Sequence, residues 1–283
     1  MSAKSGNITV LKVGGNELDR PEFLTDLANA VTKLQTAGYW SVIVHGGGRE
    51  IATWQKRLGL SPRFIEGLRV TDEESLAVAE MVLSGRMNKR LVVTLVNHGV
   101  PAVGLSGVDS GLIRVRRMQH PAGDLGWVGE IVSVAPAPVH TLLLAGIVPV
   151  VSPISLGDDG HTYNVNADHA AQALAVALHA SRLVFISNVP GVLVSGRPVH
   201  TLTVSQAGAW IAEGIITGGM IPKVRSAIAA VEAGVSQAVI TNLDGLLQNS
   251  GTIVLRENSR IRTAYYATTA RATGNQQRVT SNQ

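Results

Sequence analysis

The sequence contains no cysteine, which excludes disulfide bonds and thiolate metal sites throughout the chain. It also lacks the run of ~18 apolar residues that a membrane-spanning helix needs. The best candidate, residues 142–154, is interrupted by Pro149 and Pro153. No apolar signal segment precedes the first apolar strand, so the sequence predicts a soluble, cytoplasmic protein with no membrane partner. Its 283 residues, 45% of them hydrophobic, suffice for one large domain or for two lobes on a shared sheet.

The positive charge of the chain is concentrated at its C-terminal end. The formal net charge is +4, and residues 256–283 alone carry five arginines against one glutamate. The rest of the chain is therefore close to neutral, and the folded body is not expected to bind nucleic acid. Thr, Asn, Gln and Ser separate the arginines of residues 256–283, which predicts a disordered basic tail. Binding to nucleic acid or to an acidic surface is an alternative that the sequence leaves open for this tail alone.

Apolar strands alternate with segments of helical period along the chain. The stretches "ITVLKVGG" and "WSVIVHGGG" each indicate a buried strand that ends in glycines, and a helical segment follows each of them. Alternation of this kind predicts an α/β fold with a mostly parallel sheet. Further strands are expected at residues 101–105, 147–151, 183–187 and 238–241.

Two other segments have distinct patterns. Thr71 and Glu74 have the spacing of a capping box, which predicts a helix through about Leu83, and a second helix is expected from about Gly85 to Asn97. Residues 112–134 are rich in Arg, Val and Gly without a helical period, and they are predicted to form a β-hairpin over one edge of the sheet.

Chemistry is expected where the parallel strands end in glycines, because open sheets of this kind bind ligands at the carboxyl ends of their strands. Gly14 and Gly15 follow the first strand, and Gly46, Gly47 and Gly48 follow the second. Glycine lets backbone amides approach an anion without a Cβ in between, although a glycine pair is more often only a tight turn. Neither turn has the spacing of a Walker loop or a dinucleotide fingerprint, which disfavours both classes.

Lysine is rare in this chain, which makes its positions informative. There are 6 lysines against 18 arginines. Lys12 lies in an otherwise apolar strand, where an unpaired ammonium would cost several kcal/mol, and Lys223 follows the glycine turn "TGGMIP". Lysine supplies a compact charge for a phosphoryl oxygen, whereas the planar fork of arginine suits a carboxylate. Taken alone, Lys223 is better explained as a surface lysine at a helix start.

The stretch "YNVNADHAA" places three small polar side chains ahead of an alanine-rich helix: Asn164, Asn166 and Asp168. An Asx turn with Asp168 in the first helical turn explains the pattern on structural grounds alone. His45 precedes the second glycine turn on a buried strand, and it is assigned a structural role because no metal-ligand spacing surrounds it.

Eight motifs in order, from about Ile8 to Leu255, resemble the amino acid kinase family, and most closely its members that phosphorylate N-acetyl-L-glutamate. The motifs are "LKVGG", "VHGGG", "EGLRVTDEES", "MNKRLV", "VGLSGVDSGLI", "LGWVGEI", "YNVNADHAA" and "GIITGGMIPKV". The resemblance implies a three-layer αβα sandwich on a mainly parallel, open sheet of about eight strands. It further implies an N-terminal lobe, residues 1–180, for the amino acid and dimer contacts, and a C-terminal lobe, residues 181–255, for ATP.

The reaction implied by the resemblance is transfer of the ATP γ-phosphoryl group to the side-chain carboxylate of N-acetyl-L-glutamate, a step of arginine biosynthesis. ATP brings Mg²⁺, held mainly by phosphates and water. Lys12 and Lys223 match the family's two phosphate-contacting lysines, and Asp168 matches the aspartate that orients both. The matching substrate-binding residues are Gly46, Gly47, Arg69 (for the α-carboxylate) and Asn164, and the matching nucleotide or phosphate-binding residues are Gly14, Gly15, Ser187, Asn188, Gly219 and Met220.

Two features leave alternatives open. Asn188 stands in "SNVPGV" where these kinases usually have aspartate, and asparagine there also resembles kinases for aminoadipate or glutamate attached to a carrier protein. The intact "GLRVTD" and "GGMIPKV" favour the free amino acid. A catalytically silent amino-acid-binding regulatory protein is the third hypothesis, although no lysine or aspartate of the pattern is lost. The residues before Lys12 are poor helix formers, so a homodimer with weak or no inhibition by arginine is expected, rather than a hexamer.

Overall fold

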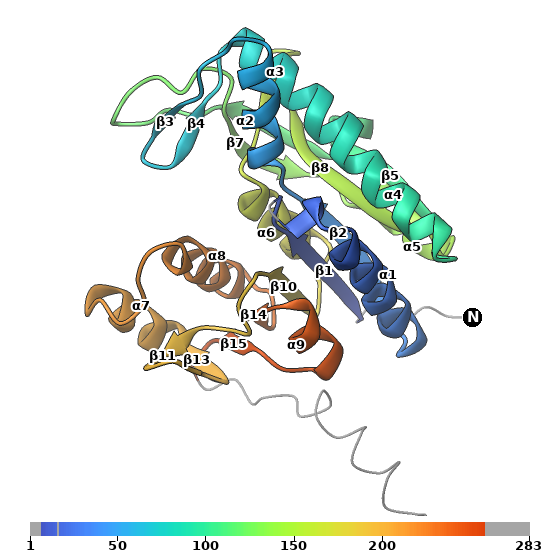
Figure 1. Ribbon diagram of the computed structural model, residues 1–283, viewed down its shortest axis with the longest axis vertical. Helices are drawn as coiled ribbons and strands as arrows, with labels where there is room; N and C mark the ends of the chain where they lie inside the picture. The colour runs from blue at the N-terminus through green and yellow to red at the C-terminus, as the bar shows by residue number, and fades with distance from the viewer. Residues whose placement is uncertain (1–6, 16, 258–283) are drawn as a thin grey trace, which may run out of the picture.

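The computed structural model of the protein describes residues 7–15 and 17–257. Its central sheet lies between two layers of helices (Figure 1). One layer contains α1 (Pro21–Thr36), α4 (Asn88–Asn97) and α9 (Leu243–Gln248). The other contains α5 (Ala137–Leu144), α6 (Ala167–Ala177), α7 (Val204–Ala212) and α8 (Met220–Glu232). The predicted α/β sandwich is thus confirmed, whereas the basic tail lies, from residue 258 on, outside the described residues.

In the described part of the chain, the central sheet has 11 strands, where about eight were expected, and it is mainly parallel as predicted. The strand β1 (Ile8–Val13) lies in the middle, with parallel neighbours β10 (Arg182–Ile186) and β2 (Trp40–His45). The full order is β13 (Thr201–Thr203), β15 (Thr252–Leu255), β14 (Ala238–Thr241), β10, β1, β2, β8 (Val148–Gly157), β6 (Ile113–Arg117) and β7 (Gly129–Val134), and β5 (Ala102–Gly107) and β9 (Thr162–Asn164) also pair with β8.

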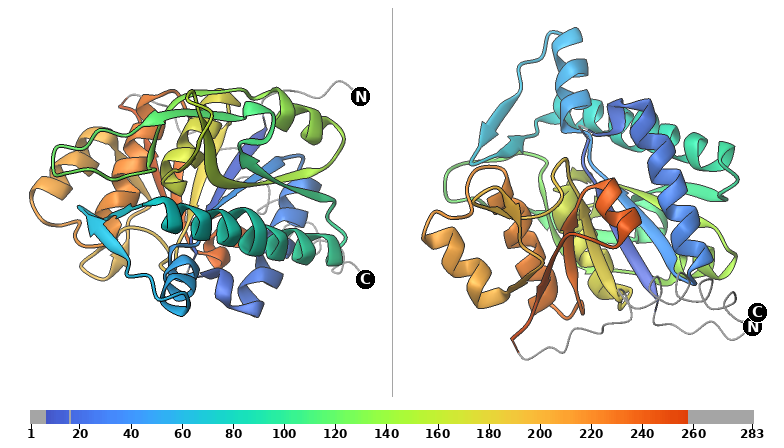
Figure 2. Two further views of the ribbon diagram at one scale, coloured as in Figure 1. Left: turned by 90° about the horizontal axis from the view of Figure 1, so that it is seen from above. Right: turned by 60° about the horizontal axis from the view of Figure 1, so that its bottom comes forward.

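Both parts of the chain contribute to this one sheet. The β1–β10 pair joins strands from before and after residue 180, the lobe boundary expected from the sequence. The division into two lobes therefore stays a prediction about function, because the sheet is continuous across residue 180. Figure 2 shows α7, α8 and α9 gathered around the C-terminal strands on one side of the molecule. Within residues 7–15 and 17–257, every helix is too short or too polar to cross a bilayer.

The alternation of side chains along β1 decides where its lysine points. Ile8 and Val10 pack in the core on the α6 and α8 face, and Leu11 and Val13 pack in the core on the α1 and α4 face. Because successive side chains of a strand alternate between faces, Lys12 shares the α6 face with Ile8 and Val10. The strand thus places its one cation beside the start of α6.

The predicted hairpin is confirmed as the antiparallel pair β6–β7, which extends the main sheet at its edge. A second hairpin, β3 (Arg63–Ile65) with β4 (Leu68–Val70), is separate from the sheet and lies beside α2 (Gly48–Arg57) in Figure 1. The remaining short elements are β11 (Leu193–Val194), β12 (Arg197–Pro198) and the 3-10 turns η1 (Glu17–Asp19) and η3 (Asp109–Gly111).

Two predictions about residues 71–97 are wrong. The capping residue of α3 (Glu73–Glu80) is Asp72, whose carboxylate accepts from the Ser75 amide at 2.9 Å. The hydroxyl of Thr71 donates instead to the Arg69 carbonyl. The chain is also helical without a break, because a π-helical segment, η2 (Met81–Met87), connects α3 to α4. Segments of this kind are frequent at functional sites.

Candidate functional site

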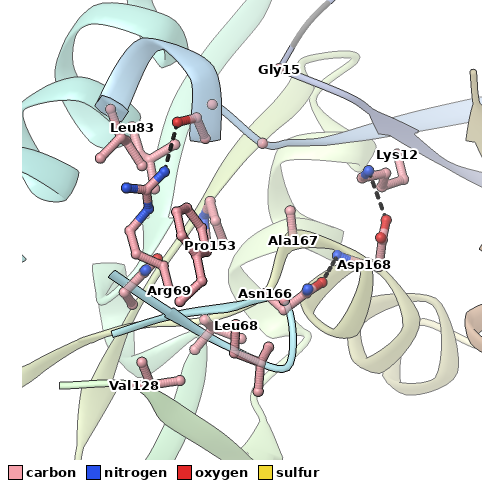
Figure 3. A pocket seen from close by; sticks show the side chains of 18 residues that line it. Lys12, Gly15, Leu68, Arg69, Leu83, Val128, Pro153, Asn166, Ala167 and Asp168 are labelled. Carbon is pink, nitrogen blue, oxygen red and sulfur yellow. Dashed lines mark hydrogen bonds and ion pairs between the residues drawn. The ribbon is translucent and has the colours of Figure 1, made fainter. Parts of the chain in front are cut away.

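A pocket of about 280 Å³ opens at the carboxyl ends of β1 and β2, beside the start of α6 (Figure 3). Its walls come from segments far apart in sequence: the two glycine turns, the β3–β4 hairpin, η2 and the segment before α6. The structure brings together these residues that the sequence predicted for a site: Lys12, Gly15, Gly46, Gly47, Arg69, Asn164 and Asp168.

The two glycine turns pack directly against each other. A Cβ added at Gly15 would lie 2.7 Å from the Cα of Gly47, and one added at Gly47 would lie 2.7 Å from the Leu83 side chain. Neither position tolerates a side chain without a shift of its neighbours. Gly47 is also the N-cap of α2, so the unpaired amides of that helix start lie at the pocket. Backbone donors in such an arrangement suit an anionic ligand.

Lys12 and Asp168 form an ion pair inside the pocket. The ammonium nitrogen lies 2.7 Å from Oδ1, and the two side chains are only 12% and 17% exposed. Asn166 caps α6, since its Oδ1 accepts from the Asp168 amide at 2.8 Å. The cap expected on structural grounds is therefore present, and it coexists with the ion pair. The first turn of α6 fixes the carboxylate that in turn orients the lysine.

Arg69 occupies the opposite side of the pocket from Lys12 (Figure 3). Its Nη2 donates to the Gly48 carbonyl at 2.9 Å, and its Nη1 donates to Gln55 Oε1 at 2.5 Å. The guanidinium also stacks on the ring of Phe64, 4.8 Å from its centroid. Partial burial lowers the pKa of Arg69 from its ordinary value, but arginine remains charged at neutral pH. The hairpin thus presents a fixed cation to the cavity.

Asn164 lines the pocket from the segment that leads into α6. Its Nδ2 donates to the Thr71 hydroxyl at 3.3 Å, and its backbone amide donates to the Trp127 carbonyl at 2.9 Å. Thr71 pairs in turn with Gly126 through a backbone bridge. Asn164 is therefore held by its side chain at Thr71 and by its backbone at the segment before β7, and it lines the cavity wall.

The other predicted residues lie outside this pocket. Ser187 and Asn188 follow β10, next to β1, and Gly219 and Met220 begin α8. Gly14 directly precedes Gly15 but does not line the cavity. These residues lie at the carboxyl end of β10 and at the start of α8, next to the pocket in topology but not part of it.

The structure does not bring Lys223 to Asp168 as the sequence interpretation requires. Within the described part of the chain, the ammonium of Lys223 donates to the Gly219 carbonyl at 3.4 Å, whereas Asp168 pairs with Lys12. The reason is local: Lys223 lies in the first turn of α8, and its side chain reaches back to its own helix start. A contact with Asp168 needs a different placement of that side chain or of α8.

A buried polar cluster beneath the second glycine turn was not anticipated as a unit. His45 is fully buried, and its Nδ1 lies 3.1 Å from the Gly46 carbonyl, which requires Nδ1 to carry the proton. Asn88 from α4 lies 3.4 Å from Nε2 and donates to the Val150 carbonyl at 2.8 Å. The cluster lies under the pocket rather than in it, in agreement with the structural role predicted for His45.

Burial lowers the pKa of His45 from 6.5 to about 4, which predicts a loss of stability in mild acid. Between these two values the unfolded chain takes up a proton that the folded chain does not, so the free energy of unfolding falls as the pH falls. At pH 5 we expect a loss of about 2 kcal/mol relative to pH 7 from this group. Urea unfolding at both pH values measures it.

The matched comparison is His45→Gln against His200→Gln, because His200 is exposed. The first variant should show a flatter dependence of stability on pH, whereas the second should retain the parental dependence. Equal pH dependence in the parent and in His45→Gln would contradict the prediction.

Sequence reasoning missed Gln55, which does not line the pocket but accepts a hydrogen bond from Arg69. It is fully buried, and its only sequence signal is a polar residue on a helix that is amphipathic in any case. Its partners, Arg69 and Ser75, lie 14 and 20 residues away along the chain. Only the folded hairpin brings the three together.

Comparison with known proteins agrees with this geometry. Residues 7–242 match the family described as "Amino acid kinase family". The chain is 52% identical over 248 residues to an acetylglutamate kinase from Roseiflexus sp. (strain RS-1), covering 88% of this chain and 93% of that protein. It is 49% identical over 253 residues to an acetylglutamate kinase from Methanopyrus kandleri, covering 87% and 99%. The crystal structure of smu.665 from Streptococcus mutans UA159 matches with a TM-score of 0.76 and 31% identity, covering 88% and 98%.

Proposed function

This chain belongs to the amino acid kinase family, and we propose that it transfers the γ-phosphoryl group of ATP to the side-chain carboxylate of N-acetyl-L-glutamate. The product is N-acetyl-L-glutamyl 5-phosphate, an intermediate of arginine biosynthesis. The observation that carries the proposal is the placement of two cations, Arg69 and Lys12, on opposite sides of one small pocket (Figure 3). N-acetylglutamate is a dianion with one carboxylate at each end, which this arrangement suits.

The transfer mainly requires stabilisation of the negative charge on the transferring phosphoryl group. The attacking carboxylate has a pKa near ~4.3 and is ionised at neutral pH, so no general base is needed. One of its oxygens forms the new bond to the γ-phosphorus, and the bond from that phosphorus to the bridging oxygen breaks, with ADP leaving. Lys12 lies where it would balance the charge on the transferring group, and Asp168 holds its ammonium in place. The amides of Gly15 and Gly47 would contact the same oxygens, whereas the amide of Gly46 donates to the Val13 carbonyl at 3.0 Å.

The nucleotide contacts follow from the second group of predicted residues. We assign to ATP the ends of β1 and β10 and the start of α8, with Gly14, Ser187, Asn188, Gly219, Met220 and Lys223. Among the described residues, no group of three or more His, Asp or Glu side chains could hold a metal ion. Mg²⁺ would accordingly be held by the phosphates and water, where it would neutralise phosphate charge. The homodimer, the cytoplasmic location and the weak or absent inhibition by arginine stay predictions.

Phosphorylation assays with ATP test the proposal directly. The purified protein should phosphorylate free N-acetylglutamate faster than N-acetyl-aminoadipate, which is longer by one methylene. Turnover of the longer compound alone would favour the carrier-protein alternative that Asn188 raises. Binding of N-acetylglutamate without any turnover would instead indicate a regulatory binding protein, and either result would overturn the proposal.

Arg69→Lys should raise the KM for N-acetylglutamate by about tenfold or more and leave kcat within a few-fold. A guanidinium can grip a carboxylate through two parallel bonds, whereas an ammonium offers a single point charge. Arg63→Lys on the same hairpin is the control, since Arg63 is exposed and does not line the pocket. Steady-state kinetics decides: an unchanged KM in Arg69→Lys would show that another group binds the α-carboxylate.

A further inference from the structure

A chain of hydrogen bonds runs from α3 through α2 to the pocket. Ser75 Oγ accepts from Gln55 Nε2 at 2.8 Å, and Gln55 Oε1 accepts from Arg69 Nη1. Gln55 is 0% exposed and Ser75 is 5% exposed, so the bonds are shielded from water. A buried amide left without partners would be costly, which means that its two bonds specify one arrangement of the helices and the hairpin.

The orientation of the Gln55 amide is determined by Arg69. A guanidinium has only donors, so the group that faces it must be the carbonyl oxygen. The Ser75 hydroxyl accepts on the other side and could equally donate. Gln55 therefore faces Arg69 with its carbonyl oxygen, because an arginine can only donate hydrogen bonds. The acceptor of Gln55 and the donor of Arg69 are complementary as well as close.

The amide fixes Arg69 without neutralising it. Gln55 and the Gly48 carbonyl engage one N–H each on Nη1 and Nη2, which leaves three of the five N–H groups for a ligand. Both anchors are neutral, and within residues 7–15 and 17–257 no ion pair involves Arg69. A glutamate at position 55 would have nearly the same shape, but it would pair with the guanidinium and cancel the charge.

We propose that Gln55 is a positioning residue that holds Arg69 in place for the α-carboxylate of the substrate and, being neutral, leaves the charge of the guanidinium available to it. The inference rests on the proposed function, in which Arg69 receives that carboxylate. Gln55 itself lines no part of the pocket. It acts only through Arg69.

Gln55→Glu is the decisive variant, because it retains the acceptor and the packing but adds the competing charge. We expect the KM and the calorimetric Kd for N-acetylglutamate to rise by about tenfold, with kcat and the KM for ATP within twofold. Gln55→Met, which retains the volume but removes the acceptor, should raise both constants severalfold. Gln206→Glu adds the same charge at an exposed position of α7 and should behave as the parent.

A second substrate separates positioning from general damage. The α-carboxamide of N-acetylglutamate lacks the charge that Arg69 would bind, so Gln55→Glu and the parent should use it with similar KM values. An equal rise in KM for both substrates in Gln55→Glu would show a merely structural role and refute the proposal. An unchanged KM and Kd for N-acetylglutamate in Gln55→Glu would also refute it. If Gln55→Glu does not fold, the calorimetric Kd of Gln55→Met decides.

The same experiment distinguishes the two proposals. A parent protein that does not phosphorylate N-acetylglutamate contradicts the proposed function, and the role of Gln55 is then contradicted with it. An active parent whose Arg69→Lys variant loses affinity while Gln55→Glu does not would leave the proposed function standing and overturn only the positioning role.

Discussion

Replacing Lys12 by methionine is expected to lower kcat roughly 100- to 1000-fold, while the KM values for both substrates change little. The ammonium would act on charge that develops as the phosphoryl group is transferred, so its loss is felt in the transition state more than in binding. Lys12→Arg should not restore the rate. The guanidinium is larger than the ammonium, and a misplacement of ~1 Å can cost about a hundredfold.

Folding must be checked in the same variants, because Lys12 is only 12% exposed and its removal leaves Asp168 without its partner. Circular dichroism and thermal unfolding measure this. Lys33→Met on the exposed face of α1 removes the same charge away from the pocket and should leave kcat unchanged. A folded Lys12→Met enzyme with near-normal kcat would mean that another residue stabilises the transferring group.

Gly15→Ala is expected to cost about 1–3 kcal/mol of stability and most of the activity. The added Cβ would lie 2.7 Å from the Cα and 2.8 Å from the amide nitrogen of Gly47, and neither backbone atom can yield without moving the second glycine turn. Both turns carry amides at the pocket, so a shift that relieves the clash also displaces the donors. Urea unfolding and kcat/KM for N-acetylglutamate measure the two effects.

Gly208→Ala is the matched control, since Gly208 lies within α7 and a Cβ there meets nothing within 4 Å. Alanine is the better helix former by about 1 kcal/mol, so this variant should be slightly more stable than the parent and fully active. The same substitution should therefore have opposite signs at the two positions. A Gly15→Ala protein as stable and active as the parent would show that the turns separate more easily than their contact indicates.

The sequence predicted the fold well because its signals were local and repeated. Strands such as "ITVLKV" combine an apolar run with a terminal glycine pair, and their alternation with helical segments admits few architectures. The predicted start of α3 was wrong because Thr71 and Asp72 are both good capping residues. Which of them caps depends on the backbone pairing of Thr71 with the segment around Gly126, and that pairing is tertiary.

The candidate site was predictable where a side chain contradicted its surroundings, and where a residue such as Arg69 or Asn164 stands in a motif that resembles the family. Lys12 is a cation in an apolar strand, and Asp168 follows a helix cap, so each drew attention before the fold was known. Gln55 had no such signal, because a glutamine on a surface-type helix is ordinary until the hairpin covers it. The position of the Lys223 ammonium depends on its rotamer and on how α8 packs, and the local sequence predicts neither.

The central position of β1 has a consequence for synthesis on the ribosome. The contact between Ile8 and Ser181 joins residues 173 positions apart, so the partner of one edge of β1 emerges late. At about 5–20 residues per second, that edge waits for ~10–35 s with its backbone donors and acceptors unpaired. An open strand edge is a template for wrong pairing. The nascent chain therefore needs shielding, by chaperones or by its own early helices, throughout the time that the strand carrying Lys12 lacks β10.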